Sequence, residues 1–249
     1  MNLDMKNTST AANKTIETAA NTSIAVNNLE YICIGKNKIR FSQPSFSVKK
    51  GELMAITGRS GCGKTTFLNL LAGYGNTKSV NPNFELKIFG KNNDESSQRR
   101  VGYISQKGLL YDKLSLSMML KHYTKVVLHK KCEIDYILEK TNLTACKKTR
   151  VANLSGGERK RAAFALELAA EADILFIDEP EAGLDDKTME EIAALFDQLL
   201  SQKKTIICAT HENKIKQKAD KFVNINGGKA YVHRADKSDT KRPDRGVLS

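Results

Sequence analysis

Residues 58–65 read GRSGCGKT, directly after the apolar run 52–57 and before a helix-forming stretch, 64–72. This is the complete pattern G-x-x-x-x-G-K-[ST], in the strand–loop–helix context that the pattern requires. Its glycines let the backbone curl so that successive N–H groups point at phosphate oxygens, and the helix adds the positive end of its dipole. The stretch predicts a phosphate-binding loop; a glycine-rich turn that binds nothing is the alternative.

The side chains of this loop have expected roles in binding a nucleotide. Lys64 would bring a positive charge to the β- and γ-phosphates, and Thr65 would offer its hydroxyl to Mg²⁺. We expect nucleotide contacts from the whole loop, which consists of Gly58, Arg59, Ser60, Gly61, Cys62, Gly63, Lys64, Thr65 and Thr66.

A second apolar run, 174–178, ends in two carboxylates, Asp178 and Glu179. Next to a phosphate loop, a carboxylate at such a strand tip holds Mg²⁺ directly or through water, which we predict for Asp178. Glu179 follows at once and is the candidate general base for a water aimed at the γ-phosphate. An acidic turn without function is the alternative, because strand ends are often polar.

Strands and helices alternate along the chain, which predicts a parallel α/β core. Apolar residues at helical spacing over 107–153 predict a small inserted helical lobe. Residues 1–22 read as a disordered tail and 236–249 as a loose polar tail. The expected strands are 24–34 and 40–48 (with breaks at Gly35 and Pro44), 52–57, 84–89, 100–105, 174–178, 205–210, and the pair 222–226 and 229–233 around Gly227-Gly228; the expected helices are 64–72, 155–170 and 187–200.

The composition is that of a globular protein. The 249 residues are 40% hydrophobic and 27% charged, which excludes wholesale disorder and collagen-like repeats. No uncharged apolar run approaches the ~18–20 residues of a membrane-spanning helix, and the start lacks the apolar core of a secretory signal. The five cysteines form no C-x-x-C pair, so we expect neither a zinc site nor a disulfide framework, but reduced thiols in a cytosolic compartment.

The chain is basic, with 40 Lys+Arg against 28 Asp+Glu and a formal net charge of +12. Much of this excess falls within 121–150, which reads as a solvated basic face, with a partner- or lipid-facing surface as the alternative. Tyr123 and Tyr136 are the only aromatics of that stretch, too few for a base-stacking platform, so we expect no nucleic acid partner.

Further motifs follow in a fixed order. Gln106 stands in GYISQKGLL, residues 154–161 read LSGGERKR, residues 183–185 read GLD, and His211 stands in CATHE. With the phosphate loop and the Asp178-Glu179 pair, this order over about residues 23–235 resembles the ATP-binding cassette (ABC) ATPases. In that family these stretches are the Q-loop, the signature, the D-loop and the switch histidine.

The signature is also interpretable from its residues. Ser155 is a good helix N-cap with Glu158 three positions on, as in a capping box. Gly156 and Gly157 allow backbone N–H groups to approach an anion closely. A capped surface helix without a ligand is the alternative. For His211, a structural or exposed histidine is the plain alternative, and its place directly after the 205–210 strand favours the sensor role.

The resemblance implies a fold and an activity. The fold is α/β, a P-loop NTPase core of a mixed sheet flanked by helices, with an antiparallel β subdomain and the inserted helical lobe, all within an ATPase domain spanning 23–235. The activity is hydrolysis of MgATP, with Lys64, Glu179 and His211 as catalytic residues. Gln106 would contact both the nucleotide and the Mg²⁺ that Thr65 and Asp178 hold.

The resemblance also implies partners. ATP would join two cassettes head to tail, as a homodimer or heterodimer, with Ser155, Gly156 and Gly157 at the γ-phosphate held by the other subunit. A separate transmembrane permease would dock in a groove beside the helical lobe, which places the chain at the cytoplasmic face of a membrane.

Some positions depart from the family pattern. Ile34 falls where an aromatic residue usually stacks on adenine, so Ile34 or Tyr31 would contact the base. Cys62 replaces the commoner serine or asparagine, and Glu181 and Ala182 stand where threonine or serine is common.

Several functions are compatible with these motifs. The details resemble the cassettes of White-type half transporters and of lipoprotein or macrolide exporters. The alternative is a soluble ABC ATPase without transport, such as an iron–sulfur cluster assembly ATPase. Binding without catalysis is disfavoured, because Lys64, Glu179 and His211 are all present.

Overall fold

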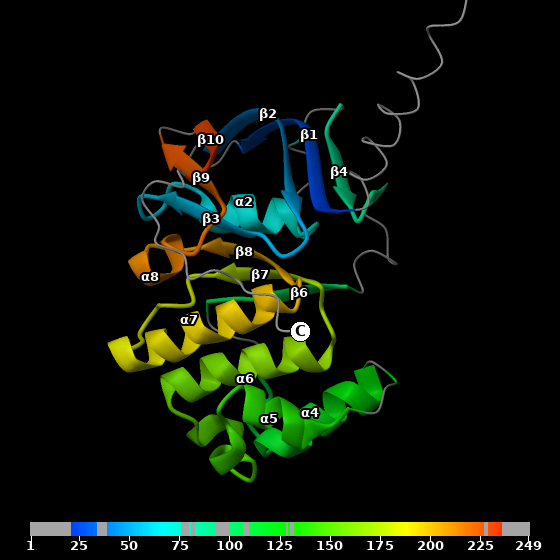
Figure 1. Cartoon of the computed structure of the whole chain (residues 1–249), viewed down its shortest axis with the longest axis vertical. Helices are drawn as coiled ribbons and strands as arrows, with labels where there is room; N and C mark the ends of the chain where they lie inside the picture. Colours follow the sequence, from blue (N-terminus) through cyan, green and yellow to red (C-terminus); the bar gives the residue numbers. More distant parts are fainter. Residues whose placement is uncertain are drawn as a thin grey trace, which may run out of the picture.

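The computed structural model describes residues 21–33, 39–75, 80, 83–92, 100–106, 110–127, 129, 132–226 and 229–235. Two sheets and several helices make up this part of the chain (Figure 1). The predicted tails lie almost wholly outside the described residues and stay predictions. The first strand begins at Thr22, the last residue of the predicted N-terminal tail.

A six-stranded sheet forms the centre of the molecule, in the order β10-β9-β3-β8-β7-β6. The neighbours from β9 to β6 pair in parallel, and β10 pairs antiparallel with β9. The parallel α/β core is therefore confirmed, as is the antiparallel pairing of the last two strands, although Gly227-Gly228 lie outside the described residues. The strands are β3 (Leu53–Gly58), β6 (Val101–Ile104), β7 (Ile174–Asp178), β8 (Thr205–Ala209), β9 (Lys221–Asn226) and β10 (Lys229–Arg234).

The antiparallel subdomain is a four-stranded sheet in the order β2-β1-β4-β5. We expected Pro44 to interrupt the second strand, but β2 continues through it, with Leu29 opposite Gln43 and Asn27 opposite Ser45. Because β2 is an edge strand of this sheet, the missing N–H of a proline is tolerated there. The strands are β1 (Thr22–Cys33), β2 (Ile39–Lys49), β4 (Glu85–Ile88) and β5 (Lys91–Asn92).

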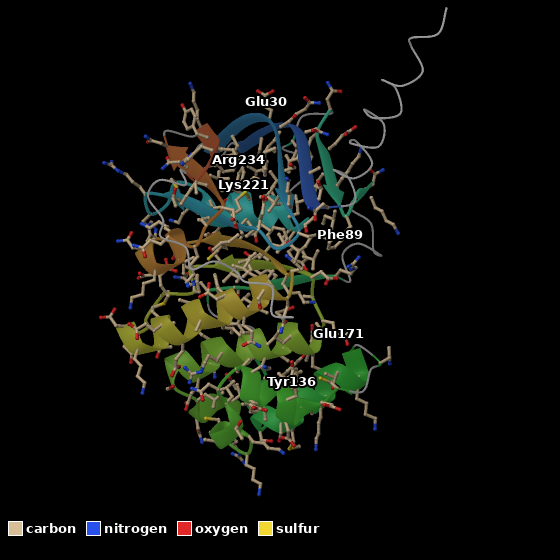
Figure 2. All side chains as sticks on the ribbon, viewed as in Figure 1. Glu30, Phe89, Tyr136, Glu171, Lys221 and Arg234 are labelled. Carbon is tan, nitrogen blue, oxygen red and sulfur yellow. The ribbon has the colours of Figure 1, made fainter. Side chains whose placement is uncertain are left out.

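A buried lysine joins the two sheets. Lys221, labelled in Figure 2, begins β9 and is only 7% exposed. Its Nζ donates to the backbone oxygen of Ser47 on β2 at 2.7 Å and to Glu52 Oε2 at 2.6 Å. A buried ammonium needs such partners, since an unpaired one would be strongly destabilising.

The two faces of the central sheet pack against different layers. On β3, Met54 and Ile56 face a core shared with the antiparallel sheet and helix α2 (Lys64–Leu71). Leu53 and Ala55 face the other core, shared with α6 (Gly156–Ala169) and α7 (Asp186–Ser201). The helix behind the phosphate loop and the helix that begins at the signature therefore lie on opposite faces of the sheet (Figure 1).

The predicted helical lobe is present and packs against α6 (Figure 1). It contains α4 (Leu116–His122), a π-helical segment (Tyr123–Val127) and α5 (Ile134–Lys140). Short 3-10 turns lie at Thr144–Cys146 and Val151–Asn153. Beyond the lobe, the short helix α8 (Asn213–Lys216) follows His211 and was not predicted.

Candidate nucleotide site

The phosphate loop has the curled backbone that its sequence predicts. Gly58, Gly61 and Gly63 have φ values of 149°, 73° and 107°, in the region where residues with a side chain are disfavoured. A Cβ at Gly58 would lie 2.5 Å from the carbonyl oxygen of Ile225 and 2.6 Å from Cys62 Sγ. The loop therefore closes against β9 only with glycine at this position.

The structure brings together the three residues with predicted catalytic roles. Lys64 is 4% exposed, and its Nζ lies 2.7 Å from His211 Nε2 and 3.3 Å from Glu179 Oε1. His211 Nε2 in turn lies 3.7 Å from the same Glu179 oxygen. The reason is topological, because β3, β7 and β8 are parallel and the segments that follow them meet at one edge of the sheet.

Thr65 and Asp178 form an oxygen-rich pair beside this cluster. Thr65 Oγ1 donates to Asp178 Oδ2 at 2.9 Å and to Oδ1 at 3.2 Å. Burial and the neighbouring charge of Glu179 raise the pKa of Asp178, and the Thr65 hydrogen bond opposes that shift. A cation placed here would stabilise the ionised form of this buried carboxylate.

The donors of this pair fit Mg²⁺, which prefers oxygen ligands. Within the described ranges, no group of three or more His, Cys, Asp or Glu side chains is placed to hold a metal ion. A magnesium ion at Thr65 and Asp178 would therefore complete its shell with phosphate oxygens and water, as is usual for this ion.

Gln106 also reaches the cluster. Its Nε2 donates to Glu179 Oε2 at 3.2 Å, because β6 lies next to β7 in the sheet. Glu179 itself has a φ of 45°, a left-handed conformation that is uncommon for residues other than glycine and is concentrated at functional sites. Gln106 and His211 thus approach Glu179 from segments on the two sides of β7.

Sequence reasoning missed Lys160. This lysine on α6 is 7% exposed, and its Nζ donates to the backbone oxygen of Gln106 at 2.5 Å and lies 3.5 Å from that of Glu179. Burial lowers its pKa, against the opposing effect of the nearby carboxylates, Glu181 foremost. The available signal was its helical spacing, since Lys160, Ala163 and Phe164 share the buried face of α6.

Glu181, one of the departures from the family pattern, holds the turn at His211. The backbone N–H of His211 donates to Glu181 Oε1 at 2.5 Å. A threonine or serine at this position has a shorter side chain. The longer glutamate thus connects the segment after β7 to the segment after β8.

The signature residues lie away from the phosphate loop of the same chain. Ser155 and Glu158 form the predicted capping box, with Ser155 N donating to Glu158 Oε2 at 2.7 Å and Glu158 N to Ser155 Oγ at 3.3 Å. A Cβ at Gly156 would lie 3.8 Å from Gly183 O, so the helix start lies beside the D-loop. Within the described part of the chain, no hydrogen bond or ion pair joins residues 155–157 to the phosphate loop.

Of the two candidates for adenine contact, Tyr31 is wrong, and Ile34 cannot be placed. Tyr31 is 4% exposed and stacks on Phe41 at a centroid distance of 5.7 Å, so it is part of the core and offers no free face to a base. Ile34 lies outside the described residues.

Comparisons with known proteins agree with this geometry. A family model described as ABC transporter matches residues 41–182. The macrolide export ATP-binding/permease protein MacB of Campylobacter jejuni is 30% identical over 224 residues, which is 86% of this chain and 34% of MacB. The Fe(3+) ions import ATP-binding protein FbpC 2 of Haemophilus influenzae is 33% identical over 195 residues, 74% of this chain and 54% of that protein. The chain thus spans about a third of MacB and about half of FbpC 2.

A solved structure is similar over most of the chain. The structure of cbiO1 from Clostridium perfringens, part of the ABC transporter complex cbiONQ, matches with a TM-score of 0.72 and 25% identity, over 85% of this chain and 87% of that one. Within the described residues, no helix is both long and apolar enough to cross a membrane. By its motif order, its fold and these likenesses, the chain belongs to the ABC transporter family, as one of its ATP-binding domains.

Proposed function

We propose that this chain is the ATP-hydrolysing subunit of an ABC transporter and drives a separate membrane permease. The observation that carries the proposal is the convergence of Lys64, Glu179, Gln106 and His211 at one sheet edge, beside the Thr65–Asp178 pair. Four different segments supply these groups, which is the arrangement that phosphoryl transfer to water requires.

The contacts of Lys64 support a mechanism in which ATP activates its own hydrolysis. The Lys64 ammonium lies 3.3 Å from Glu179 Oε1 and 2.7 Å from His211 Nε2. A triphosphate in the loop would attract Lys64 to its β- and γ-phosphates. Glu179 would then be free to orient a water and accept its proton, with Gln106 and His211 positioned on either side.

Magnesium belongs to the same proposal. The Thr65 hydroxyl and the Asp178 carboxylate would hold the ion, which when bound would offset charge on the β- and γ-phosphates.

Placement of the signature supports a two-chain site. Ser155 and Gly156 are exposed and Gly157 is half-buried, and within the described residues no hydrogen bond or ion pair joins them to the phosphate loop of their own chain. Their capped helix start suits the γ-phosphate of ATP held by a second cassette, the same chain or a related one. ATP would then lie between two subunits.

The names of the relatives support transport as the purpose. MacB is an export protein and FbpC 2 an import protein, and cbiO1 is part of a transporter complex. None of these relatives favours the iron–sulfur alternative. A permease that docks beside the helical lobe would hold the chain at the cytoplasmic face of a membrane.

Two measurements on one preparation test this proposal. The purified chain should release phosphate from MgATP, and it should co-purify with a multi-span membrane protein encoded beside it. Phosphate release no higher than that of the Lys64→Ala variant would overturn the ATPase assignment. A chain that hydrolyses ATP but associates with no membrane protein would overturn the transport assignment.

A further inference from the structure

Two segments of the backbone meet beside the phosphate loop, and Glu181 joins them. The first segment follows β7 and carries Glu179, and the second follows β8 and carries His211. Where the two strands end, Glu179 N donates to the backbone oxygen of Ala209 at 2.9 Å. Two residues farther along each segment, the N–H of His211 donates to Glu181 Oε1 at 2.5 Å. The segments are therefore joined at two points, and one of these points is a side chain.

The Glu181 carboxylate is itself well anchored. Its Oε2 atom is buried, and the backbone oxygen of Glu181 accepts from Leu184 N at 3.1 Å. A hydrogen bond from a backbone N–H to a carboxylate is charge-assisted, and it is roughly twice as strong as one to a neutral acceptor. Glu181 can therefore fix the backbone of His211 rather than follow its movements.

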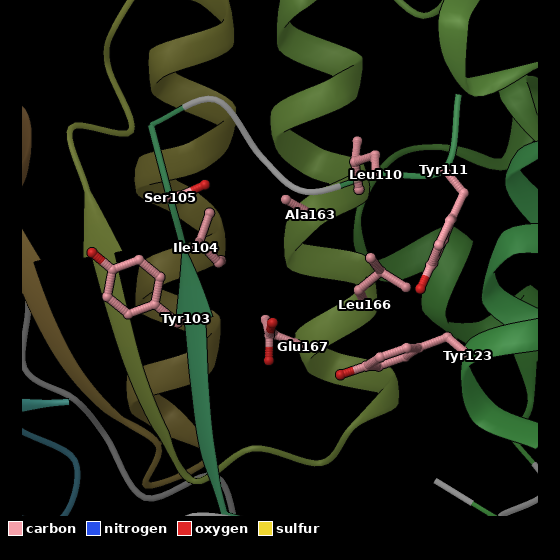
Figure 3. Close-up of a pocket in the computed structure, with 9 residues that line it drawn as sticks. All are labelled: Tyr103, Ile104, Ser105, Leu110, Tyr111, Tyr123, Ala163, Leu166 and Glu167. Atoms are coloured by element: carbon pink, nitrogen blue, oxygen red, sulfur yellow. The ribbon is translucent and has the colours of Figure 1, made fainter. Parts of the chain in front are cut away.

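A buried cation near this carboxylate stabilises its charge. Figure 3 shows the contact of α6 with β6, where Ala163 and Glu167 of the helix line a cavity of about 460 Å³. Lys160 precedes Ala163 by three residues and donates to the carbonyl of Gln106. Burial lowers the pKa of Lys160, and Glu181 opposes this effect more than any other neighbour. This attraction offsets part of the cost of holding the Glu181 carboxylate inside the fold.

The imidazole of His211 needs a fixed backbone because its own surroundings are open. Its side chain is 49% exposed, although Nε2 lies 2.7 Å from Lys64 Nζ and 3.7 Å from Glu179 Oε1. Exposed side chains change rotamer readily, so contacts of the ring alone restrict its position only weakly. The hydrogen bond from the His211 N–H to Glu181 restricts the position from which the ring projects.

Resting on the proposed hydrolysis of ATP, we propose that Glu181 is a positioning residue for the reaction. By accepting the hydrogen bond of the His211 N–H, it keeps the imidazole beside Lys64 and Glu179, where turnover requires it. The length of the side chain is decisive, because a shorter carboxylate at this place would not reach from one segment to the other. Glu181 acts in this role through His211.

Variants of the full-length chain that separate length from charge test the proposal. Glu181→Gln keeps the length and an oxygen acceptor, whereas Glu181→Asp keeps the charge and loses one methylene group. We expect kcat for MgATP to fall on the order of tenfold in Glu181→Asp and Glu181→Ala, with KM changed less than about threefold. Glu181→Gln should retain at least about a third of the wild-type kcat, since a neutral acceptor still bonds the N–H.

A double-mutant cycle shows whether Glu181 acts through His211. In a His211→Ala background, adding Glu181→Ala should lower kcat by less than about twofold, because changes to one shared interaction are not additive. Glu190→Ala is the matched control, since it removes an exposed carboxylate of α7 that pairs with Lys214 on α8 at 3.1 Å. An exposed pair contributes little, so this variant should keep the wild-type kcat.

The ring signals of the histidines give a reading that needs no turnover. The chain has four histidines, and the His211→Ala variant identifies the Cε1–H signal of His211 in NMR spectra. In Glu181→Ala and Glu181→Asp this signal should move toward that of a free histidine peptide. The signal of His233, which stacks on Phe222 at a centroid distance of 5.4 Å, should stay in place and report that the variant is folded.

Several outcomes would overturn the proposal. They are a wild-type kcat in Glu181→Asp, a fall in Glu181→Gln as large as that in Glu181→Ala, an undiminished effect of Glu181→Ala in the His211→Ala background, and an unmoved His211 signal in folded Glu181→Ala. With normal hydrolysis by the wild type, any of these results would leave the proposed function intact. A wild-type chain without ATPase activity would overturn the proposed function instead, and the NMR spectra would still test the contact.

Discussion

Lys160 Nζ donates a hydrogen bond of 2.5 Å to the backbone carbonyl of Gln106. Lys160 belongs to α6, the helix capped by Ser155, which we propose to face a second cassette. Gln106 donates to Glu179, the proposed general base. A movement of α6 would therefore be transmitted to the position of the general base through one buried side chain.

Replacing this lysine should impair turnover more than nucleotide binding. Lys160→Met keeps the length and apolar stem but leaves the Gln106 carbonyl without its charged donor. A hydrogen bond to a charged group contributes ~1.5–3 kcal/mol, so kcat should fall on the order of tenfold or more, with little change in KM for ATP. Steady-state phosphate release measures both values.

Lys229→Met is the matched control, because Lys229 is an exposed lysine on β10. It should behave as wild type. A rise in KM without a fall in kcat for Lys160→Met would contradict the positioning role of Lys160.

Lys64→Ala should abolish most ATP binding. The variant removes a charge that we expect to contact phosphate directly, a charge-assisted interaction and thus one of the stronger kinds. It also leaves Glu179 and His211 without their shared partner. Titration with a fluorescent ATP analogue should show a loss of affinity of at least about tenfold. Unchanged affinity in a folded variant would contradict the assignment of the loop.

Stability should respond to pH through Glu167. Its pKa is about 7 in the folded chain, above the ordinary value of 4.5, so between these values the folded state binds more protons than the unfolded state. The contribution of this group is complete below pH 4.5 and is lost as the pH rises through about 7. Relative to Glu167→Gln, the wild type should therefore lose unfolding free energy over this range. Parallel pH profiles in urea unfolding would contradict the raised pKa.

Charge reversal on the lobe should affect coupling to the permease. Lys121 and Lys125 are exposed and lie on either side of Tyr123 along the chain, in the helical lobe. Changing both to glutamate should leave basal ATPase activity intact, since neither lies in the nucleotide site. Because charges at an interface rim mainly change association rates, stimulation by the permease in proteoliposomes should fall and become less dependent on salt.

Lys91 on β5 and Lys229 on β10 are also exposed and lie outside the helical lobe. Changing both of them to glutamate is the matched control. That control should keep full stimulation. If the Lys121 and Lys125 variant also keeps it, this part of the lobe is not the docking surface.

The sequence was sufficient to predict those parts of the site that depend on local chemistry. The phosphate loop needs glycines and a lysine in order, and Asp178 and Glu179 end an apolar strand. Parallel strands then bring their carboxyl ends to one edge, which explains why Lys64, Glu179 and His211 meet.

Other features depended on packing between distant segments. Lys160 sits in a stretch that reads as a polar helix start, and only its neighbours β6 and β7 turn it into a buried donor. The raised pKa of Glu167 arises from burial beside β6. Tyr31 is one of two candidates for the base contact by its place in the chain, but the sheet buries it against Phe41.

Glu179→Gln should bind ATP and fail to hydrolyse it. The amide keeps the size of the carboxylate but cannot accept a proton from the attacking water. Loss of a general base typically lowers the rate by ~10²–10⁴-fold. The ion pair with Lys64 is also lost, so the lysine should move to the phosphates more readily than in the wild type.

An ATP-bound dimer should therefore accumulate. Lys64, Asp178 and the Ser155 helix start would still hold the triphosphate between two chains, and a ligand that binds only the dimer favours association by mass action. Glu179→Gln should elute from a sizing column as a dimer with MgATP and as a monomer with MgADP, while Lys64→Ala stays monomeric with both. Wild-type hydrolysis by Glu179→Gln would place the general base elsewhere. A monomer at saturating MgATP would instead indicate that the second cassette is a different chain.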